Sequence, residues 1–312
     1  MKKHRQIHDK LLQWYKKEGR HDLPWRNTDK LYHIYLSEVM LQQTQVNRVM
    51  DEYYPQFLEK FPTLKALANA KEEEVLSAWS GLGYYSRARN LHKTAKLIAA
   101  QGLPQDEKEL QKLPGIGKYT ASAICCFGKN HNIPVVDTNI KRVLKRYFAL
   151  LHVKDETIWK KAKSFVNPNN PRSHNLALMD LGSLICTAKN PKCHLCPLES
   201  SCLGKNEAEL YTKTQKKEYT QKELFFGILI KDNKIALTHS TNGMYKGLLV
   251  FPDVDPIEEN LIGSYKHSYT KYRLHVNLYK VEDFSGEKIW IKLENFDKAH
   301  ISSLVKKARK FL

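Results

Sequence analysis

The 312-residue sequence predicts an all-α N-terminal region followed by a smaller α+β domain. Three observations support this fold class. About ten segments with apolar residues at helical spacing follow one another over residues 1–203, with no strand pattern between them. Residues 204–222 are polar and rich in lysine, which is typical of a linker. Strand patterns begin only after this segment, so we expect the second domain over residues 223–312.

The helical segments of the first region are separated by prolines and glycines. They are expected at residues 7–17, 32–47, 49–61, 64–70, 72–79, 86–100, 118–127, 140–150, 158–166 and 173–184. Pro24 lies in a rigid turn after the first helix, and Pro62 precedes the fourth. Gly81 and Gly83 form a flexible turn that leads into the helix at residue 86.

The second domain combines strands with one helix. Residues 224–230 and 235–237 flank a turn at residues 232–234, which predicts a β-hairpin. Further strands are expected at residues 248–251, 272–281 and 289–291, and a basic helix ends the chain.

The chain is strongly basic. Its 51 Lys and Arg residues exceed its 33 Asp and Glu residues, which gives a net charge of +18. This excess favours a polyanionic partner, with a membrane surface as the weaker alternative. The first residues lack the apolar stretch of a signal peptide, and no segment has the length of a membrane span. We therefore expect a reducing setting, either cytoplasmic (associated with the nucleoid in a bacterium) or inside an organelle, and no membrane partner.

Four of the six cysteines lie within seventeen positions, at Cys186, Cys193, Cys196 and Cys202. Four thiolates are enough to hold a [4Fe–4S] cluster. Zinc is the competing interpretation, but structural zinc usually takes paired Cys-x2-Cys motifs and only one is present. We therefore favour iron–sulfur. Lys189 and Lys192 lie in the first loop between these cysteines, where they either contact DNA or only solvate the loop.

A glycine-rich turn lies at residues 113–121. Gly115 and Gly117 allow the backbone to turn sharply between two helices and to approach a ligand closely. The helix that starts at Lys118 then presents free N–H groups, which form an anion site. In a basic chain the expected anion is a nucleic-acid phosphate.

Two carboxylates are candidates for chemistry. Glu38 lies on a largely apolar helix, and burial there would raise its pKa enough for a general acid. Periodicity alone favours a solvated glutamate instead. Asp137 precedes a helix that it can cap, which would keep it ionised; a plain N-cap is the simpler interpretation. Together the two fit excision of a base, which needs a proton for the leaving group and an anion near the sugar cation.

Two polar segments have side chains suited to an opened duplex. Residues 42–45, one turn beyond Glu38, carry three glutamines that could fill the gap left by a flipped nucleotide. Their alternative is an exposed helix face. Tyr84 and Tyr85 follow two glycines and could insert between bases, although they suit a core almost as well.

Together these motifs resemble the helix-hairpin-helix DNA glycosylases that carry an iron–sulfur cluster, and most closely the adenine glycosylases of the MutY family. The matching stretches are residues 23–26, 37–46, 81–85 and 113–121 and the four cysteines. The resemblance implies a six-helix barrel with an iron–sulfur cluster domain, followed by a nudix-like domain. It also implies monofunctional removal of adenine mispaired with 8-oxoguanine or guanine in duplex DNA, during base excision repair.

The resemblance assigns roles to individual residues. Glu38 would protonate N7 of the flipped adenine and Asp137 would stabilise the sugar cation, with Tyr119 and Asn139 in support. The residues implied to contact DNA are Gln43, Tyr84, Gly115, Gly117, Lys118, Arg26, Lys189 and Lys192. The C-terminal domain would recognise 8-oxoguanine through Tyr269, Thr270 and Lys271.

The sequence departs from the family pattern at three positions. Tyr119 stands where the related endonuclease III enzymes carry a nucleophilic lysine, so a Schiff-base lyase is not expected. Thr138 stands where adenine glycosylases usually have glycine. Lys271 replaces the histidine of the family's Phe-Ser-His loop, which predicts a weaker preference for 8-oxoguanine over guanine. The nudix-like domain lacks the glutamate-rich signature of nucleotide hydrolases.

Two alternatives remain open at this stage. The chain could be a DNA-binding protein that senses lesions without cutting, or an endonuclease III-like glycosylase/lyase for oxidised pyrimidines. The basic surface does not separate them, because phosphate contacts carry no sequence information. One complete site per chain makes a monomer the simplest expectation.

Overall fold

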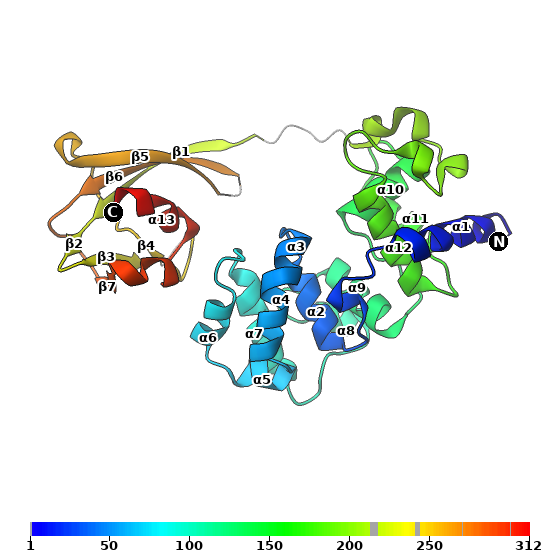
Figure 1. The fold of residues 1–312 in the computed structure, drawn as a ribbon, viewed down its shortest axis with the longest axis horizontal. Coiled ribbons are helices and arrows are strands. Elements are labelled where there is room, and N and C mark those ends of the chain that lie inside the picture. The colour runs from blue at the N-terminus through cyan, green and yellow to red at the C-terminus, as the bar shows by residue number, and fades with distance from the viewer. Residues whose placement is uncertain (1, 213–217, 241–243, 270, 300) are drawn as a thin grey trace. The chain divides into compact units, whose positions relative to one another are not determined.

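The computed structural model describes residues 2–212, 218–240, 244–269, 271–299 and 301–312. It divides into two compact units, Met1–Thr214 and Gln215–Leu312 (Figure 1). Among the described residues, no helix has both the length and the apolar character needed to cross a bilayer.

Helices are the only regular secondary structure among the described residues of the first unit. Its elements are α1 (Lys2–Glu18), η1 (Pro24–Arg26), α2 (Leu31–Met40), α3 (Val46–Arg48), the π-helical turn η2 (Val49–Tyr53), α4 (Tyr54–Lys60), α5 (Leu64–Asn69), α6 (Glu72–Ala78), α7 (Ser86–Ile98), α8 (Glu107–Gln111), α9 (Lys118–Lys129), α10 (Thr138–Tyr147), α11 (Asp155–Phe165), α12 (Pro171–Leu184), η3 (Cys193–Leu195), η4 (Glu199–Ser201) and η5 (Lys205–Thr212). This confirms the predicted all-α region.

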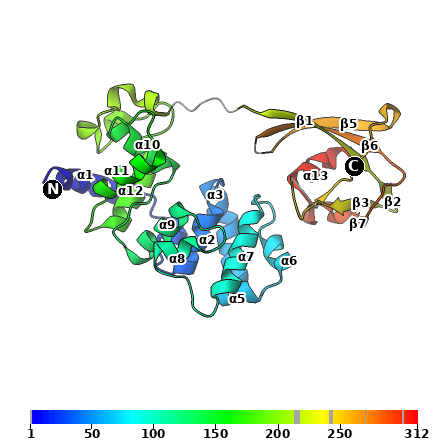
Figure 2. The same cartoon turned by 180° about the vertical axis from the view of Figure 1, so that it is seen from behind.

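The helices of this unit form two lobes that share α9. One lobe contains α2 to α8, and the other contains α1, α10, α11, α12 and the cysteine segment (Figures 1 and 2). Helix α9 contributes to both cores, with Ile124 packed in the first and Phe127 in the second. The boundary between the two lobes therefore has buried side chains on both sides. The cavity of the candidate active site opens at this boundary.

Helix α2 ends earlier than the sequence predicts. We expected one helix over residues 32–47, but α2 stops at Met40 and residues 41–44 form a turn. The carbonyl oxygens of Val39 and Met40 accept hydrogen bonds from Arg87, which satisfies groups that a longer helix would satisfy itself. Gln42 and Gln43 thus lie on a turn, and their placement on a helix was wrong.

The second unit has two sheets around one core. Its elements are β1 (Thr220–Ile228), β2 (Ile230–Lys231), β3 (Lys234–His239), β4 (Leu249–Val250), η6 (Glu258–Asn260), β5 (Leu261–Tyr269), β6 (Tyr272–Lys280), β7 (Ile289–Lys292), η7 (Leu293–Lys298), α13 (Ser303–Lys307) and η8 (Ala308–Phe311). Strand β6 is central in one sheet, parallel to β1 and antiparallel to β5. Strand β3 pairs with β2, β4 and β7 in the other. Helix α13 lies between the sheets (Figure 1).

Three predictions for this part of the chain differ from the structure. Of the predicted hairpin only the short pairing of β2 with β3 forms, because β1 pairs in parallel with β6 instead. Strand β5 was not predicted, since Ser264, Lys266 and Ser268 interrupt its apolar pattern. The expected linker begins with η5, where Ala208 and Tyr211 are buried at helical spacing, and β1 occupies its end.

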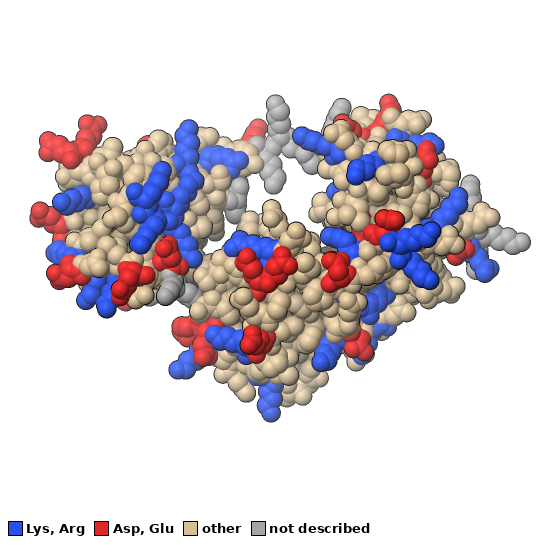
Figure 3. Space-filling model, in the orientation of Figure 1, with Lys and Arg blue, Asp and Glu red and all other residues tan. Residues whose placement is uncertain are grey.

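Lysine and arginine side chains are prominent on the molecular surface. On the face drawn in Figure 3 they form a band across the C-terminal unit and smaller groups on the helical unit. On this face, basic side chains are therefore exposed where a polyanion could contact them.

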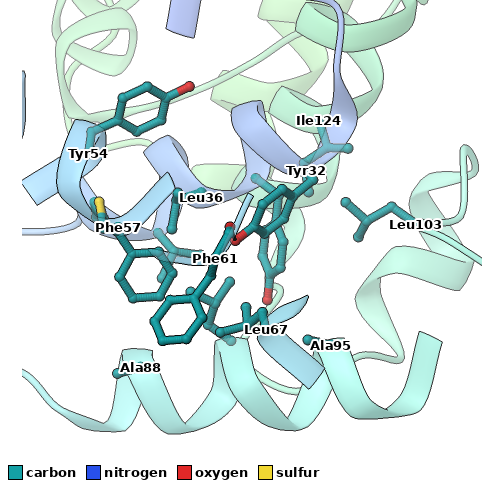
Figure 4. Close-up of a cluster of buried hydrophobic side chains, with 14 of the residues drawn as sticks. Tyr32, Leu36, Tyr54, Phe57, Phe61, Leu67, Ala88, Ala95, Leu103 and Ile124 are labelled. Carbon is teal, nitrogen blue, oxygen red and sulfur yellow. Dashed lines mark hydrogen bonds between the residues drawn. The ribbon is translucent and has the colours of Figure 1, made fainter. Parts of the chain in front are cut away.

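The core of the first lobe consists of aromatic and aliphatic side chains from α2, α4, α5 and α7 (Figure 4). Phe57 is 1% exposed, and its ring lies 4.9 Å from that of Phe61. The Tyr32 hydroxyl donates to the carbonyl oxygen of Phe61 at 2.7 Å, so its polar atom is not left unpaired. Burial of a ring such as that of Phe57 stabilises the lobe by about 3–5 kcal/mol relative to alanine.

Candidate active site and cluster site

A cavity of about 600 Å³ opens where the two lobes meet. Helices α2, α9, α10, α11 and α12 all contribute to its wall. Among its lining residues are the four predicted catalytic residues, Glu38, Tyr119, Asp137 and Asn139. These residues are as much as about a hundred positions apart in the chain, and the fold brings them to one site. A flipped nucleotide is the kind of ligand that such a volume suits.

Glu38 is buried in the wall of this cavity, with 5% exposure. Burial raises the pKa of its carboxyl group to about 7, an effect that the hydrogen bond from Tyr119 opposes and the charge of Asp137 reinforces. The Tyr119 hydroxyl donates to Oε2 at 2.6 Å. The solvated alternative is therefore excluded by the structure, and Glu38 can hold a proton near neutral pH.

Asp137 caps α10. Its Oδ1 accepts from the backbone N–H of Ile140 at 2.6 Å, and its Oδ2 accepts from Nδ2 of Asn139 at 3.0 Å. We expected the cap alone to keep this carboxylate ionised. In the structure, burial raises the pKa of Asp137, although the bonds from Ile140 and Asn139 act in the opposite direction. The donors therefore favour the charged form in a site that otherwise disfavours it.

Arg26, which we predict to contact DNA, lines the cavity and is held by a buried carboxylate. Its side chain is 6% exposed, and Nη1 and Nη2 donate to the carboxylate of Asp180 at 2.5 and 2.8 Å. Burial would raise the pKa of Asp180, but the bonds and charge of Arg26 lower it. Asp180 was missed in the sequence, although a lone charge inside an apolar helix is the same signal that drew attention to Glu38.

The glycine turn before α9 has the geometry that the sequence predicts. Gly115 has a φ of +75°, and an added Cβ would lie 2.8 Å from Cβ of Asn90. Gly117 is the N-cap of α9 and leaves the first N–H groups without a side-chain cap. The ammonium group of Lys118 lies 4.1 Å from the ring centre of Trp159. Trp159 was not predicted as a site residue from the sequence.

Gln43 and Tyr84 both have left-handed backbones, with φ of 57° and 48°. Tyr84 is 48% exposed, whereas Tyr85 packs against the core of the first lobe. The structure thus separates two tyrosines that the residue pattern by itself did not distinguish, and the exposed one is Tyr84, the one that the resemblance names.

The four cysteines line one small cavity beside α10. A guanidinium N–H of Arg146 donates to Sγ of Cys186 at 3.2 Å, which suits a thiolate ligand. Nowhere in the described part of the chain do three or more Cys, His, Asp or Glu side chains form a site for a single metal ion. Four thiols around one cavity supply the number of thiolates that a [4Fe–4S] cluster takes. Lys189 and Lys192 are exposed beside it.

Two of the three predicted lesion-recognition residues lie between the end of β5 and the start of β6. Tyr269 ends β5 and Lys271 follows in the turn, while Thr270 lies outside the described residues. The ring of Tyr245 packs 4.6 Å from that of Tyr269, and its hydroxyl is 2.7 Å from Nε2 of His267. Tyr245 and His267 were missed because nothing in the local pattern links residue 245 to β5.

Comparison with protein families assigns both regions of the helical unit. Residues 36–168 match the HhH-GPD superfamily of base excision DNA repair proteins. Residues 186–202 match the iron–sulfur binding domain of endonuclease III. The fold and site therefore define a base-excision repair protein with an iron–sulfur domain, whose cofactor is a [4Fe–4S] cluster in the segment that carries the four cysteines.

Individual relatives narrow the class. An adenine DNA glycosylase of Buchnera aphidicola from Schizaphis graminum is 34% identical over 97% of this chain and 96% of its own length. The adenine DNA glycosylase of Mus musculus is 43% identical over 62% of this chain and 40% of its own. A solved thermostable thymine-DNA glycosylase superposes with a TM-score of 0.61 at 28% identity, over 66% of this chain and 98% of its own. The chain belongs to the adenine DNA glycosylase family.

Proposed function

We propose that this enzyme is a monofunctional glycosylase that hydrolyses the N-glycosidic bond of adenine mispaired with 8-oxoguanine or guanine in duplex DNA. The observation that carries the mechanism is the pair of buried carboxyl groups in one cavity. Glu38 has a pKa of about 7, and Asp137 accepts two fixed hydrogen bonds. One group is thereby suited to give a proton and the other to hold negative charge.

The proposed reaction begins when adenine is flipped into the cavity. Protonated Glu38 donates its proton to N7 while the C1′–N9 bond breaks and its electron pair moves to the base. The carboxylate of Asp137 stabilises the positive charge left on the sugar. The raised pKa of Asp137 indicates that its buried carboxylate is unfavourable until such a cation forms beside it. Water then adds to C1′, and its proton returns to Glu38.

A lyase reaction would need a free amine at the sugar. At residue 119 the side chain is a tyrosine whose hydroxyl is bonded to Glu38. Lys118 directs its ammonium group toward Trp159 instead. Lys141 also lines the cavity, but its ammonium group is paired with Asp155. These contacts support a monofunctional glycosylase over the endonuclease III-like alternative.

The C-terminal unit is proposed to be nudix-like and to recognise 8-oxoguanine on the opposite strand through Tyr269, Thr270 and Lys271. The packing of Tyr269 against Tyr245 supports this role, because a recognition loop needs a fixed aromatic. The helices of the first lobe are proposed to form the family's six-helix barrel. We further propose that the chain acts as a monomer at the nucleoid.

The proposal is tested by single-turnover base release from a duplex with adenine opposite 8-oxoguanine. Strand breaks are counted with and without alkali, for the cluster-loaded enzyme and for Glu38→Gln. Breaks that form only after alkali, and only with Glu38 present, are expected. Binding of the lesion duplex without base release by the intact enzyme would contradict excision and favour the lesion sensor. Breaks without alkali would favour a lyase.

A further inference from the structure

Arg87 lies between the two turns that carry Gln43 and Tyr84. It is on α7, outside every motif that the sequence assigns to chemistry or DNA. Its Nη1 donates to the carbonyl oxygens of Val39 at 2.9 Å, Met40 at 2.8 Å and Gln42 at 2.7 Å. Its Nη2 donates to Oγ1 of Thr44 at 3.2 Å and to the carbonyl oxygens of Leu82 at 3.2 Å and Gly83 at 3.1 Å. One guanidinium group therefore bonds to both turns.

The charge of Arg87 is buried without a carboxylate. The residue is 8% exposed, and none of the ion pairs in the described part of the chain involves it. Burial lowers its pKa to about 10, so it remains charged at neutral pH. Carbonyl dipoles at the end of α2 and the rings of Trp79 and Tyr84, at 5.4 and 5.5 Å, compensate the charge. Such a charge is tolerated only while these partners stay in place.

The two turns also store backbone strain. Gln43 and Tyr84 are both non-glycine residues with left-handed φ values, which disfavour their backbones relative to ordinary turns. Four of the six acceptors of Arg87 are within two residues of one or the other: Gln42 and Thr44 flank Gln43, and Leu82 and Gly83 precede Tyr84. The guanidinium thus holds the backbone beside each strained residue.

We propose that Arg87 is a positioning residue that joins the Gln43 turn (residues 41–45) and the Tyr84 turn (residues 81–85) into one unit. The two side chains then enter the base stack together when adenine leaves it. This inference rests on the proposed function, because it presumes that Gln43 and Tyr84 act on DNA. It adds a residue that contacts no base itself but sets how both inserting side chains are presented.

Lysine cannot replace arginine in this role. Its single ammonium group has three donors at one point, whereas the four Nη N–H groups of Arg87 lie in one plane and share six acceptors on two sides. Arg87→Lys therefore keeps the charge and removes the bridge. Arg89→Lys is the matched control, because Arg89 is on the same helix and its Nε contacts Glu72 at the surface.

The test measures affinity for two duplexes with the cluster-loaded full chain. One duplex carries 2′-fluoro-2′-deoxyadenosine, whose fluorine blocks excision, opposite 8-oxoguanine; the other is fully matched. Arg87→Lys is expected to reduce the preference for the mispaired duplex by about 10-fold, the equivalent of losing one or two good hydrogen bonds. Arg89→Lys is expected to change it by less than about two-fold. Cluster absorbance and circular dichroism check that each variant is folded.

A double-mutant cycle separates positioning from general destabilisation. With Arg87 present, Gln43→Ala and Tyr84→Ala are expected to be non-additive, because loss of one side chain weakens the unit that presents the other. In the Arg87→Lys background, the free-energy effects of Gln43→Ala and Tyr84→Ala on the preference for the mispaired duplex are expected to be additive. Independent losses with Arg87 present would overturn the proposal, as would an unchanged preference in Arg87→Lys.

If Arg87→Lys does not fold, Thr44→Val provides the same test. It removes one acceptor of the guanidinium at nearly constant volume, and a smaller loss of preference, about two- to five-fold, is expected. An unchanged preference in Thr44→Val would overturn the proposal in that case. Failure of the proposed function is distinguishable, because the unmodified enzyme would then release no adenine whatever residue 87 is.

Discussion

The two units differ in how they treat charge. The helical unit buries Glu38, Arg87, Arg146 and Asp180, and each has specific partners there. In the described part of the C-terminal unit, Asn277 and Ser302 are the buried polar residues, and neither is ionisable. A buried charge is expensive and persists where the fold over-determines its surroundings.

This difference indicates that the two units have different roles. Acid–base chemistry needs carboxyl groups removed from water, because only then does their pKa approach the working pH. Recognition of a base needs donors, acceptors and aromatic faces at the surface, which the turn around Tyr269 and Lys271 offers. We therefore expect changes in the helical unit to alter the rate of excision, and changes in the C-terminal unit to alter which mispair is chosen.

The largest effect is expected from Glu38→Gln. The amide has nearly the same shape and can keep the bond to Tyr119, but it cannot give a proton to adenine. Single-turnover excision is expected to fall by about 10²–10⁴-fold. Binding of duplex DNA should change little, because phosphate contacts dominate affinity. A rate within a few fold of the unmodified enzyme would contradict the acid role.

A change of pH is expected to have a smaller effect, of about tenfold in the excision rate per pH unit above the pKa of Glu38. Glu38 must be protonated to act, and its pKa is about 7. The excision rate should therefore be level at lower pH and fall as pH rises through about 7. Tyr119, Asp137 and Arg26 are the charged or titratable groups that shift this pKa, and all belong to the helical unit. The profile should persist after removal of residues 215–312. A shifted profile would contradict the assignment of the acid–base chemistry to the helical unit alone.

The pH dependence of the unfolding free energy should also be set by Glu38. The folded-state pKa of Glu38 is raised above its ordinary value of 4.5, so its contribution to stability is present at low pH and lost as pH rises through about 7. Relative to Glu38→Gln, the unmodified enzyme should lose about 2–3 kcal/mol of unfolding free energy between about pH 5 and about pH 8. Urea unfolding at both pH values measures this. An equal loss in both proteins would argue that Glu38 is more exposed than the structure shows.

Prediction from the sequence succeeded where a signal is local. The α-helical region follows from apolar spacing, the cap at Asp137 from its position before a helix, and the cluster from four nearby cysteines. The burial of Glu38 could not be derived in this way. It depends on α9 and Tyr119, which are about eighty positions away.

The failures have a shared physical cause, since each depends on a distant partner. Helix α2 ends at Met40 because Arg87, on another helix, takes its carbonyl groups. Asp180 was missed because its partner Arg26 is 154 positions away in the chain. Strand β5 forms on polar residues because β6 provides a hydrogen-bonding partner. No periodicity in the sequence records these pairings.

Removal of the C-terminal unit should affect choice more than binding. A truncated chain ending before residue 215 keeps every described cavity residue, and the solved thymine-DNA glycosylase shows that a chain aligning to about two thirds of this one forms the helical fold. The preference for adenine opposite 8-oxoguanine over adenine opposite guanine is expected to fall by about 10-fold, the discrimination given by one good pair of base contacts. Excision rates and affinities for both duplexes measure this. Equal losses on the two duplexes would contradict a recognition role.

The smallest effect is expected from Lys271→His. Guanine presents an acceptor at N7, whereas 8-oxoguanine presents an N–H donor there and an additional oxygen at C8. Lysine has three donors and no acceptor, so Lys271 cannot bond to that N–H, but a neutral histidine can. The preference for 8-oxoguanine should therefore rise, by about two- to five-fold for one neutral hydrogen bond. Lys266→His, an exposed change on β5, controls for the lost charge. If both variants raised the preference equally, charge rather than hydrogen-bond direction would be the cause, and residue 271 would have no special part in choosing the mispair.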